Sequence, residues 1–348
     1  MTIPSTQSIS LGDISVELGR PRTTQIALGD PEVRTFLGIA SGQIGLGQVR
    51  GQTFGRAVVS RVVSAHAMNL VINLNSLPGY VAGKSDITIT VNSGIYLWSD
   101  SATPGLSITG GTVGDTVKLV NNGFIMGKGG NGQYYDSVAG LDIAPTVGQP
   151  ALSTSFNLTI DTLNGYIGGG GGGGAGYTCG GGGAGGGLGG YYSGSSVPGA
   201  GGAIGTKGTN GSGASWGAGG GGGRIMPGAN TARAVAVGLV NVQGPGGDAG
   251  GGGGIAYVCW VYPGAGGGGW GAKGGNVTVA ADSSNANFTL YGGLGSGAGN
   301  IGGSETLVGG LAQSVPYVGA AGGKAIVTNG KTITYVGASA ARVFGIVG

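Results

Sequence analysis

Few residues of this chain have the types and spacing that enzyme chemistry requires. The segment Gly79–Ser85 resembles a phosphate-binding loop, but three residues separate its glycines where that motif needs four. No helical pattern follows the segment, so the sequence predicts a turn there. His66 is the only histidine of the chain and lies beside apolar residues, which favours a structural role over a catalytic one.

The cysteines and carboxylates do not form a recognisable site either. Cys179 and Cys259 are the only cysteines and lie 80 positions apart, so two free thiols are favoured over a disulfide. The 13 acidic residues are scattered, without the close pairs near a strand end that a glycosidase uses. The sequence therefore predicts no catalytic residue, no metal site and no cofactor, and a protein that is not an enzyme.

Glycine dominates the composition, with 89 of 348 residues against about 7 per cent in ordinary proteins. Charged residues make up only 8% and the net charge is +3, which argues against nucleic acid or an anionic membrane as a partner. No apolar segment reaches about 18 residues, so no membrane insertion is expected. The start of the chain lacks a secretory pattern, so we expect synthesis in a reducing cytoplasm.

The texture of the sequence changes along the chain and predicts a mainly β and irregular fold in four regions. These are a small docking module at 1–60, a β-strand-rich domain at 61–163, a glycine-rich region at 164–303 and a C-terminal β segment at 304–348. In the last region, Asn329-Gly330 between two β-rich stretches predicts a hairpin.

A short repeat marks the docking module. The motif Ile-x-Leu-Gly occurs at residues 9–12, 26–29 and 44–47, and each copy predicts a brief extended stretch closed by a glycine turn. Asp30 followed by Pro31 and ending at Gly38 predicts a short helix, and residues 13–19 have the same form. A compact polar module follows from this pattern.

Five β-branched stretches with partial alternation predict strands in the second region: 58–63, 70–74, 87–91, 117–120 and 156–160. Two related segments, Asn122–Gly129 and Asn164–Gly171, lie 42 positions apart and lead from a strand into glycine. We interpret them as one repeated transition from strand to glycine tract.

Residues 165–303 hold 57 glycines in 139 positions, in tracts at 168–176, 180–190, 199–213, 217–223, 244–254, 264–275 and 292–303. A flexible linker is the simple interpretation, but the aromatic residues between tracts favour packing. Polyproline II-type helices have three residues per turn and no internal hydrogen bonds, so buried ones must bond to neighbouring chains. Each helix face that meets a neighbour should then be glycine.

The spacing of the glycines is compatible with such helices. Gly199, Gly202, Gly205, Gly208 and Gly211 form one unbroken face, and 244–253 follows the same spacing. In the tract 264–275, Trp270 and Lys273 are expected to point outward, whereas 168–176 is bare enough to have neighbours on every side. A tract of about nine residues would be about 28 Å long. The segments between tracts are then forced to the two ends of the bundle.

The run 117–132, followed by the glycine tract 168–190 that Tyr177 and Cys179 interrupt, resembles the adhesins at the tips of long tail fibres of T-even-type phages. The resemblance covers roughly residues 85–303. It implies a layered polyglycine II sandwich on the virion whose intervening segments recognise a bacterial outer-membrane protein or lipopolysaccharide. The N-terminal repeat instead resembles the starts of glycine-rich tail proteins of other phages, which implies attachment to another tail or tail-fibre protein.

The intervening segments that the resemblance assigns to binding are 177–179, 191–198, 214–216, 224–243, 255–263 and 276–291. Rigid aromatic side chains dominate binding hot spots, so we expect receptor contacts from Tyr191, Tyr192, Trp216, Tyr257, Trp260 and Tyr262. Packing against the bundle end is the alternative for each of them. The sequence does not tell which end of the bundle faces the host.

Three other functions stay open at this point. A purely structural tail-tip or baseplate component would share the docking module but bind no receptor. A glycine-helix ice-binding protein would need a flat face of small residues, and bulky segments interrupt these tracts. An enzyme that degrades surface polysaccharide is the third alternative.

Overall fold

The computed structural model describes residues 9–18, 20–37, 39–49, 56–176, 180–194, 196–213, 218–228, 247, 264–280, 295, 297–301, 305–308 and 317–348. The chain divides into two compact units. The first consists of Met1–Ser60, Asn75–Ile87 and Gly111–Thr116, and the second of Arg61–Leu74, Thr88–Gly110 and Val117–Gly348.

The N-terminal segment of the first unit is helical. It contains α1 (Leu11–Glu17), α2 (Pro31–Leu37) and α3 (Leu46–Val49). Ile14, Ile26, Val33 and Val49 form its buried core. The helix predicted after Asp30 is confirmed, whereas α1 begins before the predicted residue 13. Ser10 caps α1, and the Asp13 side chain bonds back to the Ser10 backbone, so Asp13 lies inside the first turn.

The three Ile-x-Leu-Gly copies share one contact between a side chain and the backbone. The side chain of the residue after each glycine accepts a hydrogen bond from the backbone N–H three positions earlier: Asp13 from Ser10 (2.8 Å), Asp30 from Ala27 (2.9 Å) and Gln48 from Gly45 (2.8 Å). This contact starts a helical turn. The prediction of extended stretches was therefore wrong for the first and third copies, whose leucine and glycine lie inside α1 and α3.

Fourteen strands of the chain form three sheets, which we call A, B and C. Sheet A has the order β1 (Ala57–Val63), β4 (Ser85–Val91), β7 (Thr116–Asn121), β12 (Leu158–Asp161) and β19 (Ile333–Tyr335). Sheet B has β2 (Ala67–Met68), β5 (Tyr96–Trp98), β8 (Phe124–Met126), β13 (Tyr166–Gly168) and β20 (Val343–Phe344). Sheet C has β3 (Leu70–Asn73), β6 (Leu106–Thr109), β11 (Leu152–Thr154) and β18 (Ile326–Val327).

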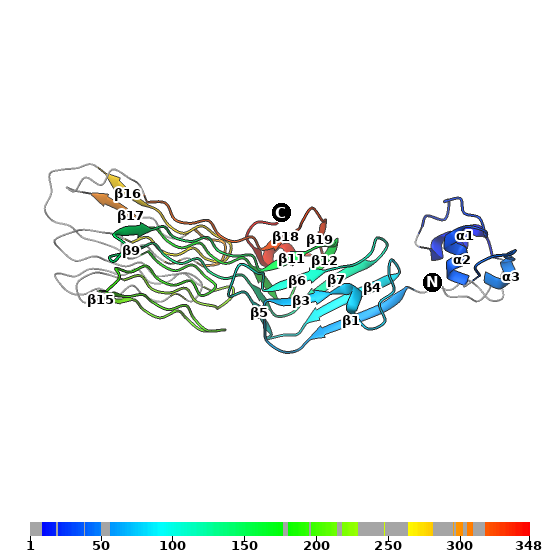
Figure 1. Cartoon of the computed structure of the whole chain (residues 1–348), viewed down its shortest axis with the longest axis horizontal. Coiled ribbons are helices and arrows are strands. Elements are labelled where there is room, and N and C mark those ends of the chain that lie inside the picture. The colour runs from blue at the N-terminus through cyan, green and yellow to red at the C-terminus, as the bar shows by residue number, and fades with distance from the viewer. Residues whose placement is uncertain are drawn as a thin grey trace. The chain divides into compact units, whose positions relative to one another are not determined.

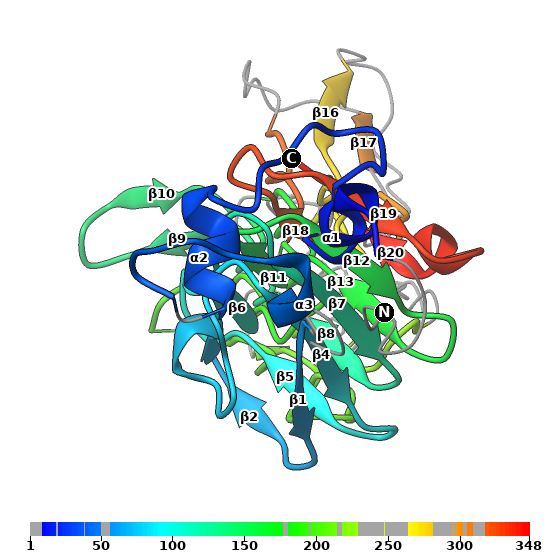
Figure 2. The same cartoon turned by 90° about the vertical axis from the view of Figure 1, so that its right-hand side faces the viewer.

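These strands wind as a parallel β-helix. The chain visits sheets A, B and C in turn, and the pairs between successive coils are parallel. In Figure 2, β2, β5, β8, β13 and β20 follow one another in that order. Two 3₁₀ turns, η1 (Leu74–Ser76) and η2 (Ser339–Arg342), lie at corners of the coils.

Alternation of side chains explains why these stretches are strands. In β4, Ile87, Ile89 and Val91 are buried while the threonines between them are partly exposed. The stretches predicted as strands are confirmed as β1, β3, β4, β7 and most of β12. The repeat at 42 positions is confirmed too, because Tyr166 pairs with Phe124 in neighbouring strands.

The predicted C-terminal hairpin is wrong. The strands on either side of Asn329-Gly330 are β18 and β19, which belong to different sheets and pair with β11 and β12 instead. Asn329 and Gly330 have positive φ values of 50° and 76°, so the dipeptide turns a corner of the β-helix. Strands of the stretches 61–163 and 304–348 therefore share the same sheets.

Two long insertions leave the β-helix between sheets B and C. One joins β8 to β11, and the other joins β13 to β18. Glycine-rich runs continue the strands outward and return to them, and they lie side by side in Figure 1. We call the described runs the glycine array: 127–133, 144–150, 169–176, 180–190, 199–211, 218–223, 264–276 and 317–325. Short strands at its margins are β9 (Tyr134–Asp136), β10 (Leu141–Ile143), β14 (Ser196–Val197), β15 (Ser212–Gly213), β16 (Val277–Ala280) and β17 (Glu305–Val308).

Backbone hydrogen bonds in the array follow a period of three. From Gly170 to Ala175, successive N–H groups point to three different neighbours, and every third one returns to the same neighbour. Gly170 and Gly173 donate to Gln149 and Thr146, Gly171 and Gly174 to Ala184 and Gly181, and Gly172 and Ala175 to Ala272 and Gly275, over 2.8–3.1 Å.

The carbonyl groups of this run accept hydrogen bonds from two further runs and again from 264–276. The donors are Gly130 and Gln133 in 127–133, Ala320 and Gly323 in 317–325, and Gly268 and Gly271 in 264–276. A Cβ on Gly170, Gly171 or Gly172 would overlap a carbonyl oxygen of one of these neighbours. The run 169–174 thus has neighbours on every side, as its composition predicts, and has no room for a methyl group.

Several predicted tracts fold back on themselves. Gly185 and Gly186, Gly205, and Gly271 have positive φ values and lie in turns that reverse the chain. The face predicted to be unbroken from Gly199 to Gly211 is therefore split at Gly205. The prediction that Trp270 points outward is wrong as well, because its side chain is fully buried beside the turn at Gly271. Only Gly247 of the tract 244–254 lies within the described residues.

Candidate functional site

The turns of the glycine array that pack on sheet B define what we call its near end. Aromatic side chains from sheet B meet the turns there, and the cluster consists of Met126, Ala184, Met226 and Trp270 with Tyr96, Trp98, Phe124, Tyr166, Ala298 and Phe344 around it. The indole Nε1 of Trp270 donates to the Ile225 carbonyl at 2.8 Å. This end is closed by packing.

Arg224 shows that one predicted binding segment begins at the near end. Its Nη1 donates to the Gly202 carbonyl at 2.8 Å, and its guanidinium lies against Gly186 in the near-end turn. Burial lowers the pKa of Arg224, and the charge of Asp100 partly opposes that shift. The start of the segment 224–243 is therefore part of the scaffold.

The opposite, far end of the array carries β9 and β15, as Figure 1 shows. Strand β9 pairs antiparallel with β10 on one side. On its other side, Tyr135 bridges Tyr192 in parallel, with Tyr135 N–H donating to the Tyr191 carbonyl and Ser193 N–H to the Tyr135 carbonyl, both at 3.0 Å. The segment 191–193 thus becomes a third strand of a small sheet, which we call the far-end sheet.

Two tyrosine pairs occupy this far-end sheet. Tyr134 stacks on Tyr191 with ring centroids 4.9 Å apart, and Tyr135 stacks on Tyr192 at 5.0 Å. Neighbouring residues of a strand point to opposite faces, so each face of the sheet carries one pair. All four rings are half-buried. They present rigid surfaces that are apolar on the ring and polar at the hydroxyl.

Hydroxyl and carboxyl groups fix the loop beside these rings. Ser137 Oγ donates to the Ser193 carbonyl at 2.7 Å, and the Ser137 N–H donates to Ser193 Oγ at 2.8 Å. Asp136 accepts hydrogen bonds from the N–H groups of Val138 (2.9 Å) and Ala139 (3.2 Å). Val138 is 94% exposed, so the tip of this hairpin is held in place by polar contacts at its base.

Asp142 of β10 is the carboxyl group of the far-end sheet with a shifted pKa. Burial raises its pKa, and a hydrogen bond from the Tyr317 hydroxyl at 3.4 Å partly counteracts the shift. Tyr317 packs on Ala175 and Ala265 at the end of the array. The carboxyl group therefore ties β10 to the array.

The structure places Tyr191 and Tyr192 of the predicted binding residues in the far-end sheet. Trp216, Tyr257, Trp260 and Tyr262 lie outside the described residues, and so do Cys179 and Cys259. Sequence reasoning missed their stacking partners Tyr134 and Tyr135. A signal existed: Tyr-Tyr follows a glycine run at both 134–135 and 191–192.

The residues that resemble catalytic motifs have structural roles. The segment 79–85 is a turn with positive φ at Gly79 (80°) and Gly83 (71°), as predicted. His66 Nδ1 accepts a hydrogen bond from the Tyr96 N–H at 3.2 Å, and its ring meets the Tyr96 ring edge-on. Within the described ranges, no three His, Cys, Asp or Glu side chains gather as metal ligands. No helix in that part of the chain is long and apolar enough to cross a membrane.

A model of the family described as phage tail fibre adhesin Gp38 matches residues 57–250, more than half of the chain. This chain belongs to the Gp38 family of phage tail fibre adhesins. The match spans the β-helix strands from β1 to β13, the short strands β9, β10, β14 and β15, and the Tyr-Tyr segments of the far-end sheet. Membership makes the chain a protein of the phage tail and indicates a non-enzymatic role.

Two further comparisons give little more. The solved gp37–gp38 adhesin tip complex of the bacteriophage S16 long tail fibre shares 16% identity with the chain, over 95% of this chain and 96% of that one. The TM-score is 0.37, which does not by itself establish a common fold. No sequence among the curated proteins matches the chain.

Proposed function

We propose that this Gp38-family adhesin recognises a receptor on the bacterial surface through the segments at the far end of the glycine array. The far-end sheet carries the proposal, because two separate loops are joined there into one rigid element with four tyrosine rings. Tyrosine supplies a large contact area at low conformational cost, since few torsions are frozen on binding. The near end is filled by packing, which leaves the far end for recognition.

We further propose that the glycine array is a polyglycine II sandwich. The three-residue period of the N–H donors, with a different neighbour for each face, supports this assignment. Such a lattice is rigid because each backbone group is bonded to another run. The array then serves as a scaffold that holds binding segments in fixed positions.

The receptor belongs, in this proposal, to the bacterial outer membrane and is a protein or lipopolysaccharide. Tyr191 and Tyr192 contribute with their partners Tyr134 and Tyr135. Trp216, Tyr257, Trp260 and Tyr262 belong to the proposal as aromatic residues of further segments between the glycine tracts. No cofactor or metal takes part.

The proposed docking region is the N-terminal module at 1–60, which attaches the adhesin to another tail or tail-fibre protein. Its own buried core and its three equivalent turns support an independent docking role. Leu11 and Leu46 of the repeat are each 41% exposed and are available to a partner. The proposed receptor-binding region is the glycine-rich stretch 164–303.

Adsorption experiments test the receptor proposal. Purified full-length protein should bind receptor-bearing cells and compete with the phage for adsorption. The Tyr191→Ala and Tyr134→Ala variants should each weaken that competition about tenfold or more, as hot-spot tyrosines do. The Val113→Ala variant, at a 93% exposed valine, is the matched control and should behave as the natural protein does.

The same experiment distinguishes an adhesin from the alternative, a structural tail component that binds no receptor. Such a protein would neither bind cells nor block adsorption, although it would still be found in the tail. Unchanged competition by both tyrosine variants, with their thermal stability intact, would contradict the assignment of the far-end sheet to binding.

A further inference from the structure

The first coil of the β-helix has an open edge on all three sheets. Strands β1, β2 and β3 each stand at one end of the strand order of their sheet, and Figure 2 shows β1 and β2 at the lower margin of the β-helix. Val62, Met68 and Val71, one residue from each of these strands, are 52%, 49% and 57% exposed. An edge strand presents a row of backbone groups to any chain that can pair with it.

The same three residues direct their backbone groups to this edge. Neighbouring residues of a parallel strand bond to opposite sides. The residue beside each of the three bonds to the second coil, over 2.9–3.1 Å: these residues are Val63, Asn69 and Leu70. The N–H and C=O groups of Val62, Met68 and Val71 therefore point away from the second coil.

The composition of the first coil is unusual for an edge in water. Exposed edge strands are commonly protected by several charged side chains or by proline. Residues 57–74 contain one charged residue, Arg61, and no proline. At the opposite end of the β-helix the chain covers an edge itself, because Val347 bridges Ile326 of β18. The first coil thus has the character of an edge that another chain covers.

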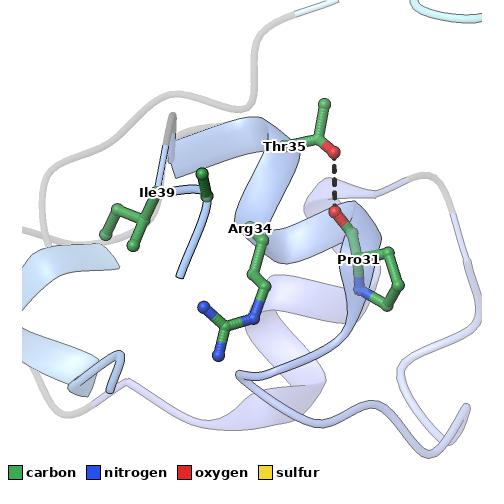
Figure 3. A pocket seen from close by; sticks show the side chains of 5 residues that line it. Pro31, Arg34, Thr35 and Ile39 are labelled. Atoms are coloured by element: carbon green, nitrogen blue, oxygen red, sulfur yellow. Dashed lines mark hydrogen bonds between the residues drawn. The ribbon is translucent and has the colours of Figure 1, made fainter. Parts of the chain in front are cut away.

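The described part of the docking module offers no strand for this edge. Its described residues between 9 and 49 form α1, α2, α3 and the turns that join them. Their polar groups bond within the module: Figure 3 shows the Thr35 hydroxyl donating to the Pro31 carbonyl, at 2.7 Å. Arg34 Nη2 donates to the Gly42 carbonyl at 2.8 Å. These residues form a self-contained helical unit.

The order of the chain indicates which molecule is brought to the first coil. The docking module and the coil are consecutive, since α3 ends at Val49 and β1 begins at Ala57. A tail protein that holds the module is therefore tethered to the coil by a short stretch of chain. Tethering raises the effective concentration of its surface at the coil, so even a short strand pairing becomes favourable.

We propose that the tail or tail-fibre protein that holds the docking module also adds an extended strand to the first coil, along β3 (Leu70–Asn73). The strand bonds to the open N–H and C=O groups of Val71, and its apolar side chains cover the exposed valine. The inference rests on the proposed docking function of the N-terminal module. It gives the adhesin a second point of attachment, which fixes its orientation on the tail.

Particles of the same phage assembled without this chain are the probe. Purified full-length protein is titrated onto them, and attachment is measured by co-sedimentation. Val71→Pro removes the N–H group that points to the open edge and keeps the ladder with β6, in which that group takes no part. We expect attachment to weaken about tenfold or more, because one hydrogen bond is lost and the proline ring blocks the added strand.

Val347→Pro is the matched control at the opposite end of the β-helix. Val347 is 40% exposed, and its N–H also points away from its neighbouring strand, because Ile346 and Gly348 make the bonds to β18. This variant should attach as the natural chain does. Both variants should keep the thermal stability of the natural chain, since proline is tolerated where an edge N–H is unused.

Hydrogen exchange tests the pairing without any substitution. In the free chain, the Val71 amide should exchange fast, and on the particles its exchange should slow about tenfold or more. The Leu70 amide, which bonds to Gly105 at 3.0 Å, is the internal control and should be slow in both states. Mass spectrometry at residue resolution follows both amides.

Several outcomes would overturn this inference while the docking proposal stands. One is equal attachment of Val71→Pro and the natural chain, and another is a Val71 amide that exchanges equally fast before and after attachment. Slow exchange in the free chain would assign the edge to a second copy if the protein is a dimer in solution, and to the chain itself if it is a monomer.

Failure of the natural chain to attach to the particles would overturn the docking proposal together with this inference. The receptor proposal is tested separately by cell binding.

Discussion

The β-helix and the glycine array are continuous in the chain but are stabilised by opposite means. In β7, Leu119 is fully buried, and the strand forms its ladder hydrogen bonds with the neighbouring strands β4 and β12 of sheet A. In the run 169–174, no residue has a side chain, and hydrogen bonds run to five described neighbouring runs. The core stabilises one region and the backbone lattice stabilises the other.

The change from one mode to the other occurs within a few residues. Phe124 to Met126 pair as strand β8, and Gly127 already belongs to the array. A strand uses a period of two because its side chains need two faces, whereas a side-chain-free run uses a period of three. Glycine is thus what allows a strand to leave its sheet and still satisfy its backbone.

The largest effect should follow from adding a side chain to the centre of the array. Gly171→Val places atoms where the Gly268 carbonyl lies, with backbone on every side. We expect a loss of more than about 4 kcal/mol in the free energy of unfolding, or no soluble protein, measured by denaturation and yield. Gly47→Ala, with nothing within 4 Å, is the control and should change stability by about 1 kcal/mol or less. Equal behaviour of the two variants would contradict the packed lattice.

Removing a side chain from the β-helix should have the next largest effect. Leu119→Ala leaves a cavity in the core and should cost about 2–5 kcal/mol, measured by chemical denaturation. The two variants change side-chain size in opposite directions, because Leu119→Ala removes three carbon atoms and Gly171→Val adds three. If Leu119→Ala lowered the free energy of unfolding by less than Val113→Ala does at an exposed valine, the coils would not be packed around Leu119.

A smaller effect is expected at the seam between the two regions. Trp270→Phe keeps most of the ring but removes the hydrogen bond to the Ile225 carbonyl. We expect a loss of about 1–3 kcal/mol and faster amide exchange in the near-end turns at 184–186 and 270–271. Amide exchange that rises equally across the β-helix would instead mean that the two regions unfold together.

The smallest effect concerns the pH dependence of the far end. Because burial raises the pKa of Asp142 in the folded state, its contribution to stability is complete at low pH and is lost as the pH rises through the folded pKa. Asp142→Asn should therefore raise the midpoint of thermal unfolding at neutral pH, and raise it less at about pH 3. A uniform shift across this range would contradict the assigned pKa direction.

Much of this architecture could be predicted from local sequence patterns. Alternating Ile87, Ile89 and Val91 predicted a strand, and the segments 42 positions apart predicted a repeated transition from strand to glycine, which the structure shows after β8 and β13. The bare run 168–176 predicted neighbours on every side, because a chain without Cβ atoms is free to pack in all directions. Tyr191 and Tyr192 were named as binding candidates by residue type alone.

Long-range partners decided the rest. Whether Asn329-Gly330 closes a hairpin or turns a corner depends on the strands β11 and β12 that receive its two sides. Trp270 is buried because the chain reverses at Gly271 beneath sheet B, and Tyr134 meets Tyr191 because two insertions end side by side. Period and composition are local properties that a sequence records directly, whereas the direction of a run and the choice of its neighbours depend on contacts between residues far apart in the chain.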